Sequence, residues 1–289
     1  MLIKNFASNK IILGTVNFGI KYGVEKSQVK MVKVNAIINS AIRNKINFFD
    51  TAQSYGQSET LLGHIKNKIM IITKINPDKS WSNFDLFSSN IQKTLKKLNK
   101  KKIDTILFHD TKIFKTEHGK LIFSHLNYFK KKKIIKNIGF SIYEFSDLDF
   151  LLKKYKFDII QCPFNILDRR LVDDGYLKIL KKNNIKVHVR SVFLQGVLVN
   201  QSLSSHPYFI RWKKKLDKWF EYLQIKKIHP VEACLSYVLS SGIDKIILGI
   251  SNPNELGEIL ESRYIKKIKL LKIFTIRDKK LINPSVWNI

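Results

Sequence analysis

Residues 47–59 read NFFDTAQSYGQSE, an apolar run that ends on Asp50 and is followed by Tyr55 in a turn rich in Gly and Ser. Apolar residues before a turn predict a buried strand, and this strand delivers a carboxylate and a phenol to one loop. An Asp after a strand also serves as an ordinary turn or helix-capping residue. The residues at the ends of the other strands therefore decide whether Asp50 and Tyr55 belong to a chemical site or to a simple turn.

Outward from this stretch, short apolar runs alternate with longer segments of helical period over the whole chain. The strand-like runs are residues 11–19, 46–52, 69–75, 103–110, 135–143, 157–165, 185–193 and 244–251. The helical segments lie near residues 29–44, 57–67, 85–99, 119–133, 146–155, 173–183, 230–241 and 253–263. Parallel strands need helical crossovers and read as continuous apolar runs because both of their faces are buried.

Eight strand-plus-helix units predict an α/β fold of the (β/α)₈ TIM-barrel class. A doubly wound open sheet is the alternative, but GTVNFG at residues 14–19 does not match the phosphate-binding pattern G-x-G-x-x-G. No linker divides the chain, so we expect one domain over residues 1–289. An extra helix is expected near 208–226, and a tail follows residue 264.

The composition is that of a folded chain, with 44% hydrophobic residues among 289, despite a formal net charge of +29. No segment approaches 18 uninterrupted apolar residues, and the N-terminus lacks an apolar signal region, so we expect a cytoplasmic protein without a membrane partner. Cys162 and Cys234 form no C-x-x-C pair, and we expect neither a disulfide framework nor a metal site.

Much of the positive charge lies in lysine-rich stretches at 66–68, 96–102, 130–136, 153–156 and 181–186, each before a predicted strand. These are expected helix C-termini, where cations complement the helix dipole. A solvated rim on the face opposite the barrel mouth is the interpretation that we favour. Nucleic-acid binding through this rim is the alternative.

Polar side chains gather at three consecutive strand ends: Asp50 and Tyr55, then Lys74, then His109. Taken singly, each has a structural explanation. Together they suit carbonyl reduction, because a phenol with a pKa near 10 needs a neighbouring ammonium to stabilise its phenolate. Asp50 would hold Lys74 charged, and His109 would bind the substrate oxygen. His188, inside the VHV run, is interpreted as structural.

The ordered motifs DTAQSYG, ITK and LFHD, preceded by GTVNFG, resemble the aldo-keto reductases, which are NAD(P)H-dependent barrel enzymes. The resemblance implies a catalytic tetrad of Asp50, Tyr55, Lys74 and His109, with Tyr55 as the general acid that protonates an aldehyde or ketone. A cofactor-binding barrel that acts through partners without catalysis is an alternative function.

The resemblance also implies a set of cofactor contacts at the strand ends. These are Gly14, Thr15, Asp50, Ser141, Gln161, Arg190, Ser191, Phe193, Gln195, Gly196, Gly249, Ser251, Asn252 and Glu255. Ile142 stands where the family has Asn, and Arg190 where it often stacks an aromatic ring on the nicotinamide. A guanidinium also stacks, but its charge disfavours the oxidised cofactor. The family resemblance implies NADPH, whereas Glu255 suits a free ribose hydroxyl and leaves NADH open.

Phe18, Trp81 and Asn165 are the residues expected to shape the substrate pocket at the mouth. The stretches RSVFLQG and FNILDRRL are similar to a bacterial branch of the family associated with surface-polysaccharide or sugar metabolism. This similarity favours a small, sugar-like carbonyl substrate. The oligomeric state is left open.

Overall fold

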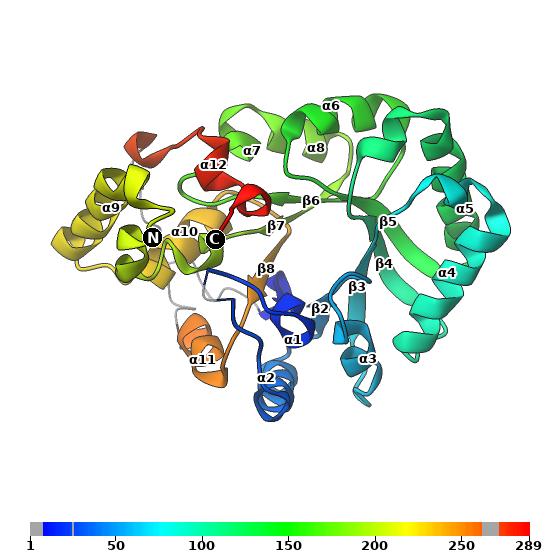
Figure 1. Ribbon diagram of the computed structural model, residues 1–289, viewed down its shortest axis with the longest axis horizontal. Helices are drawn as coiled ribbons and strands as arrows, with labels where there is room; N and C mark the ends of the chain where they lie inside the picture. The colour runs from blue at the N-terminus through cyan, green and yellow to red at the C-terminus, as the bar shows by residue number, and fades with distance from the viewer. Residues whose placement is uncertain (1–7, 25, 262–271) are drawn as a thin grey trace.

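Eight parallel strands close into a barrel in sequence order in the computed structural model, which describes residues 8–24, 26–261 and 272–289. The strands are β1 (Ile11–Gly14), β2 (Phe48–Asp50), β3 (Met70–Ile75), β4 (Ile103–Phe108), β5 (Ile135–Ser141), β6 (Ile159–Pro163), β7 (Lys186–Arg190) and β8 (Lys245–Gly249). β1 pairs with β8, so the sheet has no free edge. The predicted TIM-barrel class is confirmed (Figure 1).

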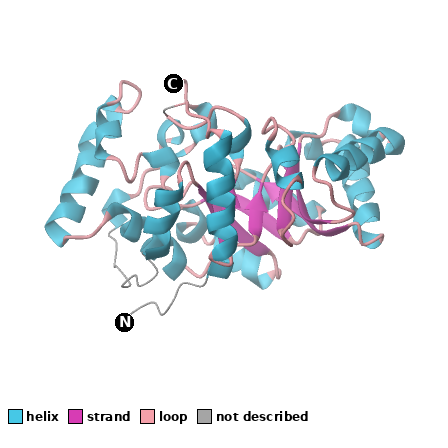
Figure 2. Ribbon diagram, turned by 90° about the horizontal axis from the view of Figure 1, so that it is seen from below, coloured by secondary structure: helices cyan, strands magenta, loops and turns pink. Residues whose placement is uncertain are grey.

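Helices surround the barrel on its outside (Figure 2). They are α1 (Val16–Gly19), α2 (Met31–Arg43), α3 (Ser58–Gly63), α4 (Phe84–Lys97), α5 (Glu117–Lys131), α6 (Phe145–Lys154), α7 (Arg170–Asp173), α8 (Tyr176–Lys182), α9 (Lys213–Lys226), α10 (Pro230–Ser240), α11 (Pro253–Glu261) and α12 (Lys279–Ile282). Short 3-10 helices lie at Ser8–Lys10, Lys79–Ser82, Lys112–Lys115, Leu194–Gly196, Gln201–Ser205, Ile210–Trp212, Lys272–Phe274 and Pro284–Val286.

The barrel interior is built in layers, because alternate residues of a strand point to the same side of the sheet. One layer is apolar and consists of Ile12, Ile72, Leu107, Ile159 and Ile247, which pack on one another and on Phe48. Within this layer Ile12 is the register partner of Ile247 on β8 and of Phe48 on β2. Further toward the carboxyl ends, at or near the last residues of the strands, alternation places the residues that we call the inward polar layer: Gly14, Asp50, Lys74, His109, Ser141, Gln161, Arg190 and Gly249.

Most boundaries agree with the sequence to within a few residues, and the differences have local causes. The first strand ends at Gly14 instead of residue 19, because Asn17 of α1 turns to donate to the carbonyl of Ile250 and to Ser251. α3 ends at Gly63 instead of residue 67, where a Cβ would lie 2.3 Å from the carbonyl oxygen of Lys97. The helix expected over 173–183 is divided at Gly175, which has a φ of 82°.

The extra helix after the seventh strand is α9, which begins at Lys213 after a short 3-10 turn and lies at one end of the molecule, shown in yellow (Figure 1). The end of the last expected helix, at 262–263, and the first part of the predicted tail lie outside the described residues. From Lys272 onward the tail packs on the barrel, with Leu281 and Ile282 buried.

The last turns of α4, α5, α6 and α8 each carry two lysines, as the charge pattern predicted. These turns lead into the amino ends of the following strands, on the side of the barrel opposite the layer that contains Asp50. Cys162 and Cys234 are both buried and unpaired, as expected. Within the described part of the chain, no helix has the length and apolar character needed to cross a membrane.

Candidate active site

A cavity of about 380 Å³ opens at the carboxyl ends of the strands, where the inward polar layer lies. Its lining comes from the ends and following loops of β1, β2, β6, β7 and β8. Asp50, Tyr55, Gln161 and Arg190 line it, and it extends to Ser251 and Glu255 at the start of α11. The carboxyl-terminal face is where TIM barrels hold their active sites.

Asp50 and Lys74 form a buried ion pair in this layer. The Lys74 Nζ lies 2.5 Å from Asp50 Oδ1 and also donates to the Thr51 carbonyl at 2.9 Å. The second carboxylate oxygen of Asp50 accepts from Gln161 Nε2 at 2.8 Å. The Lys74 side chain is 1% exposed. Burial lowers the pKa of Lys74, and the Asp50 carboxylate opposes that shift. The carboxylate therefore fixes the ammonium in one position.

Tyr55 and His109 complete a compact group around Lys74. The Lys74 Nζ lies 4.9 Å from the centre of the Tyr55 ring, and the His109 ring meets that ring edge-on at 5.9 Å. The structure thus brings together Asp50, Tyr55, Lys74 and His109, which the sequence places on three different strands and their loops.

The pKa of Tyr55 differs from the sequence-based expectation. Lys74 was expected to lower it, but burial of the phenol, followed by the charge of Asp50, raises it well above its usual range. The expectation was wrong because desolvation and the Asp50 charge penalise a phenolate more than the Arg190 guanidinium stabilises it. At neutral pH Tyr55 is therefore a protonated phenol.

His109 is neutral over the same range. Burial, and then the positive charges of Lys74 and Arg190, lower the pKa of His109 to about 3. A neutral imidazole keeps one N–H donor and one acceptor. His109 can therefore donate a hydrogen bond to an oxygen in the mouth without carrying charge.

The loop that carries Tyr55 is fixed by close backbone packing. A Cβ on Gly19 would lie 1.7 Å from the Tyr55 carbonyl oxygen, so only glycine fits there. Gly56 has a φ of 54°, which glycine adopts without strain. Below the loop, Ser58 at the start of α3 is hydrogen-bonded to Thr15 and Thr51. The position of the phenol is therefore set by the ends of β1 and β2 together.

Several predicted cofactor residues meet in the mouth. Ser141 donates to Gln161 Oε1 at 3.2 Å, which joins the ends of β5 and β6. After β7 the backbone is strained, because Ser191 and Gln195 have φ values of 59° and 51°. Strained non-glycine residues are concentrated at ligand sites, where their N–H groups can form anion-binding concavities. Also lining the cavity are Gly14, Thr15, Phe193, Gly196 and Gly249.

The far end of the cavity lies at the N-terminus of α11. Asn252 Oδ1 accepts from the backbone N–H groups of Asn254 and Glu255, and Glu255 reaches back to accept from Ser251 N at 2.7 Å. This arrangement is similar to a capping box, except that Glu255 accepts from the N–H of the residue before the cap. Nearby, Asn17 Oδ1 is buried without a hydrogen-bond partner among the described residues. Ser251 and Glu255 line the cavity, while Asn252 serves as the cap.

The three predicted substrate residues are not gathered at this cavity. Phe18 is buried in the core between barrel and helices. Trp81 packs edge-on against Phe87 at 5.7 Å. Asn165 is fully buried, where its side-chain oxygen accepts from Leu167 N and its amide donates to the Ser191 carbonyl. Within this structure all three have packing or loop-holding contacts.

Two tyrosines at the mouth were missed by the sequence reading. Tyr22, in the loop after α1, lines the cavity, and its hydroxyl accepts from Gln195 Nε2 at 3.0 Å. Tyr143, after β5, lies flat beneath the Arg190 guanidinium, with 3.7 Å from Cζ to the ring centre. The available signal was an aromatic residue at a strand end, since Tyr22 follows the expected strand 11–19 by three positions and Tyr143 is the last residue of the expected strand 135–143.

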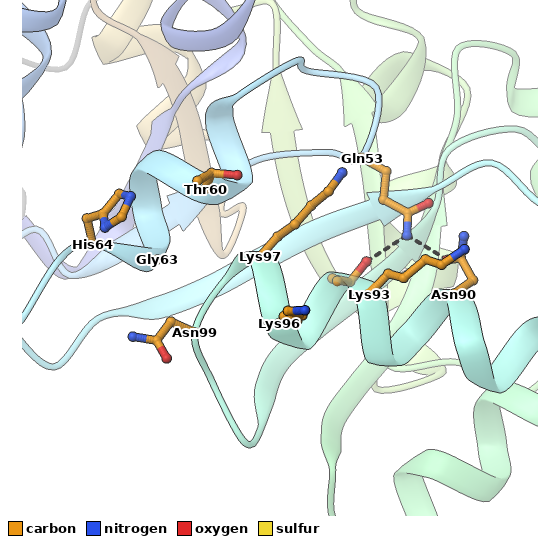
Figure 3. Close-up of a pocket in the computed structure, with 10 residues that line it drawn as sticks. Gln53, Thr60, Gly63, His64, Asn90, Lys93, Lys96, Lys97 and Asn99 are labelled. Atoms are coloured by element: carbon orange, nitrogen blue, oxygen red, sulfur yellow. Dashed lines mark hydrogen bonds between the residues drawn. The ribbon is translucent and has the colours of Figure 1, made fainter.

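A second cavity, of about 650 Å³, lies outside the barrel between α3 and α4. Lys93, Lys96 and Lys97 of α4 line it, and Gln53 is held there by hydrogen bonds of 2.6 Å to Asn90 and Thr94 (Figure 3). Of the described residues that line it, none is acidic. Its lining comes mainly from α3 and α4 and contains none of Asp50, Tyr55, Lys74 and His109. We therefore assign the candidate active site to the smaller cavity at the mouth.

The sequence pattern of the Aldo/keto reductase family matches residues 10–272, nearly the whole chain. The protein therefore belongs to this family and is an oxidoreductase of the NAD(P)H-dependent class. The resemblance drawn from DTAQSYG, ITK and LFHD is confirmed, and the non-catalytic and nucleic-acid alternatives are not favoured.

Among known proteins the chain is similar to D-arabinose 1-dehydrogenase of Saccharomyces cerevisiae, with 21% identity over 283 residues that cover 89% of this chain and 83% of the yeast protein. In fold it is similar to the holo form of an aldo-keto reductase from Bacillus halodurans, with a TM-score of 0.73 and 17% identity over 93% and 92% of the two chains. A glycerol dehydrogenase from Gluconobacter oxydans gives a TM-score of 0.68 and 18% identity over 94% and 92%.

Proposed function

We propose that Tyr55 is the general acid in the reduction of an aldehyde or ketone to an alcohol, assisted by Asp50, Lys74 and His109. The observation that carries the proposal is the buried Lys74–Asp50 pair placed beside the Tyr55 ring, with a neutral His109 edge-on to the same ring. A nicotinamide dinucleotide held in the mouth would supply the hydride for the carbonyl carbon.

Residues of the protein donate the proton and stabilise the charge that its transfer leaves behind. The Tyr55 hydroxyl gives its proton to the carbonyl oxygen as that oxygen gains negative charge, and the high pKa of the phenol keeps the proton available beforehand. The Lys74 ammonium stabilises the phenolate that remains, and Asp50 holds that ammonium in place. His109 donates a hydrogen bond to the same carbonyl oxygen. Solvent then returns a proton to Tyr55.

We propose that the cofactor lies along the mouth cavity, from Gln161 and Arg190 to the start of α11. The strained loop after β7 suits the pyrophosphate, and the buried, unpartnered Asn17 Oδ1 marks a polar cradle nearby. The family resemblance favours NADPH. Glu255 opposes that preference, because its carboxylate already accepts the Ser251 N–H that a 2′-phosphate would use. We therefore propose that the site also accepts NADH.

We propose a small polyol or sugar-like carbonyl as the substrate. The name of the yeast relative, a D-arabinose dehydrogenase, and that of the Gluconobacter relative, a glycerol dehydrogenase, support hydroxylated substrates. Phe18, Trp81 and Asn165 remain predicted substrate residues. Loops that rearrange around a bound substrate would be needed to bring them to the mouth.

The test combines cofactor titration with a carbonyl screen. Quenching of protein fluorescence gives the dissociation constants of NADPH and NADH, and turnover of a panel of sugar aldehydes follows with the tighter cofactor. Tyr55→Phe removes only the hydroxyl. We expect its chemical rate to fall by about a hundredfold or more with little change in cofactor affinity. Near-normal turnover by this variant would refute the assigned role.

A further inference from the structure

Arg190 is the last residue of β7 and belongs to the inward polar layer. It lines the mouth cavity together with Asp50, Tyr55 and Gln161. His188 pairs with Gln161 of β6, and Arg190 lies two residues further along β7, so it lies nearer the mouth than Gln161 does. The family resemblance implies that Arg190 stacks on the nicotinamide, but its contacts indicate a second use.

The guanidinium is held from one face and one edge. Its Cζ lies 3.7 Å from the centre of the Tyr143 ring, a close cation–π contact. One terminal nitrogen donates to the Ile142 carbonyl at 3.0 Å. A guanidinium carries five N–H donors in a fixed planar fork. Within the described residues this is its one side-chain hydrogen bond, so most of its donors are unused by the protein.

Arg190 is also the one unneutralised charge among the described reactive groups of the mouth, since the other lining carboxylates, Glu255 and Glu258, lie on α11 at the far end of the cavity. Asp50 and Lys74 neutralise each other, while Tyr55 and His109 are uncharged at neutral pH. Among the described residues, Arg190 makes no ion pair with a carboxylate. Its charge acts on the reacting groups directly, since it helps to lower the pKa of His109 and opposes the rise at Tyr55. A half-buried cation in this position is stabilised by an anion brought in by a ligand.

We propose that Arg190 binds an anionic substituent, a carboxylate or a phosphate, on the carbonyl substrate. The inference rests on the proposed function and narrows its substrate class to anionic aldehydes or ketones, such as a sugar acid or a sugar phosphate. Tyr143 holds the guanidinium from one face, and Arg190 lines the mouth cavity. Bidentate hydrogen bonds from a guanidinium fork recognise the planar carboxylate or the phosphate group specifically.

The experiment compares two pairs of matched aldehydes. Succinic semialdehyde is set against butanal for the carboxylate, and glyceraldehyde 3-phosphate against glyceraldehyde for the phosphate. For each pair the measured quantity is the ratio of kcat/KM, anionic over neutral, which cancels any general loss of activity. We expect the wild type to favour one anionic member by about 10- to 100-fold. The pair that shows the preference identifies the anion.

Two variants and one control locate the effect. Arg190→Gln should bring the ratio close to one, and Arg190→Lys should retain part of it because the charge stays while the fork is lost. Arg43→Gln removes the same charge from the exposed outer side of α2 and should leave the ratio unchanged. An equal fall in Arg190→Gln and Arg43→Gln would point to overall charge and would overturn the proposal.

The outcomes separate this inference from the proposed function. Turnover of both members of each pair with a ratio near one in the wild type refutes the role of Arg190 and leaves carbonyl reduction standing. No turnover of any aldehyde, with cofactor bound, refutes the proposed function itself. Arg190→Gln could instead raise the dissociation constant of NADPH and lower kcat/KM equally for both members of a pair. In that case Arg190 acts on the cofactor and the proposal is overturned.

Discussion

Removing the Lys74 ammonium should destabilise the protein strongly, because it would leave the Asp50 carboxylate buried with only the Gln161 amide as a donor. Both side chains are almost inaccessible, at 1% and 5% exposure. Breaking a buried ion pair on one side costs about 3–5 kcal/mol. Lys74→Met should therefore lower the free energy of unfolding by that amount, a large share of the roughly 5–15 kcal/mol typical of proteins.

The double variant gives the sharper test. Asp50→Asn alone leaves the Lys74 ammonium buried without its counter-ion. The losses of unfolding free energy in the two single variants should therefore sum to roughly 6–10 kcal/mol. In Asp50→Asn, Lys74→Met no charge remains, and the main loss is the donor to the Thr51 carbonyl. We expect a loss of about 1–3 kcal/mol, far below the sum. Urea unfolding at neutral pH, followed by far-UV circular dichroism, measures all three.

Lys130 provides the matched control. Its Nζ lies 2.5 Å from an Asp158 oxygen, the same separation, but the two side chains are 33% and 31% exposed. Lys130→Met should cost at most about 1 kcal/mol, since water solvates the carboxylate that remains. If Lys74→Met loses no more than this control, or if the double variant equals the sum of the singles, burial does not control the energy of this pair and the reasoning is wrong.

Three further predictions follow from the same structure. Gly19→Ala puts a methyl group against the Tyr55 carbonyl and should lower kcat at least about tenfold in a folded protein, whereas Gly257→Ala, which meets nothing within 4 Å, should not. Burial, then Lys245 and Lys186, lower the pKa of His188 to about 3. The unfolded chain protonates this histidine near pH 6.5, so about 2 kcal/mol of stability should disappear between pH 7 and pH 5, and His188→Gln should remove that part of the slope in urea unfolding. Glu255→Gln should lower the ratio of the NADPH to the NADH dissociation constant several-fold in fluorescence titration; an unchanged ratio would mean that this carboxylate does not act on cofactor choice.

The sequence by itself determined the class of fold and the chemistry-bearing residues. Alternating apolar runs and helical segments are local features, and eight repeats of them have few ways to pack other than a closed barrel. Polar residues at consecutive strand ends must then share one face. For this reason Asp50, Tyr55, Lys74 and His109 were predictable as a group, and Arg190 was identified as an unusual residue at its position.

Only the tertiary structure decided what surrounds each of these groups. Closing the barrel buries the Tyr55 phenol and thereby raises the pKa that sequence reasoning expected to fall. The same closure draws Phe18 into the core and places the Tyr143 ring under the Arg190 guanidinium. Desolvation and contact depend on atoms supplied by strands and loops that are distant in the chain, whereas periodicity and residue type are properties of each segment alone.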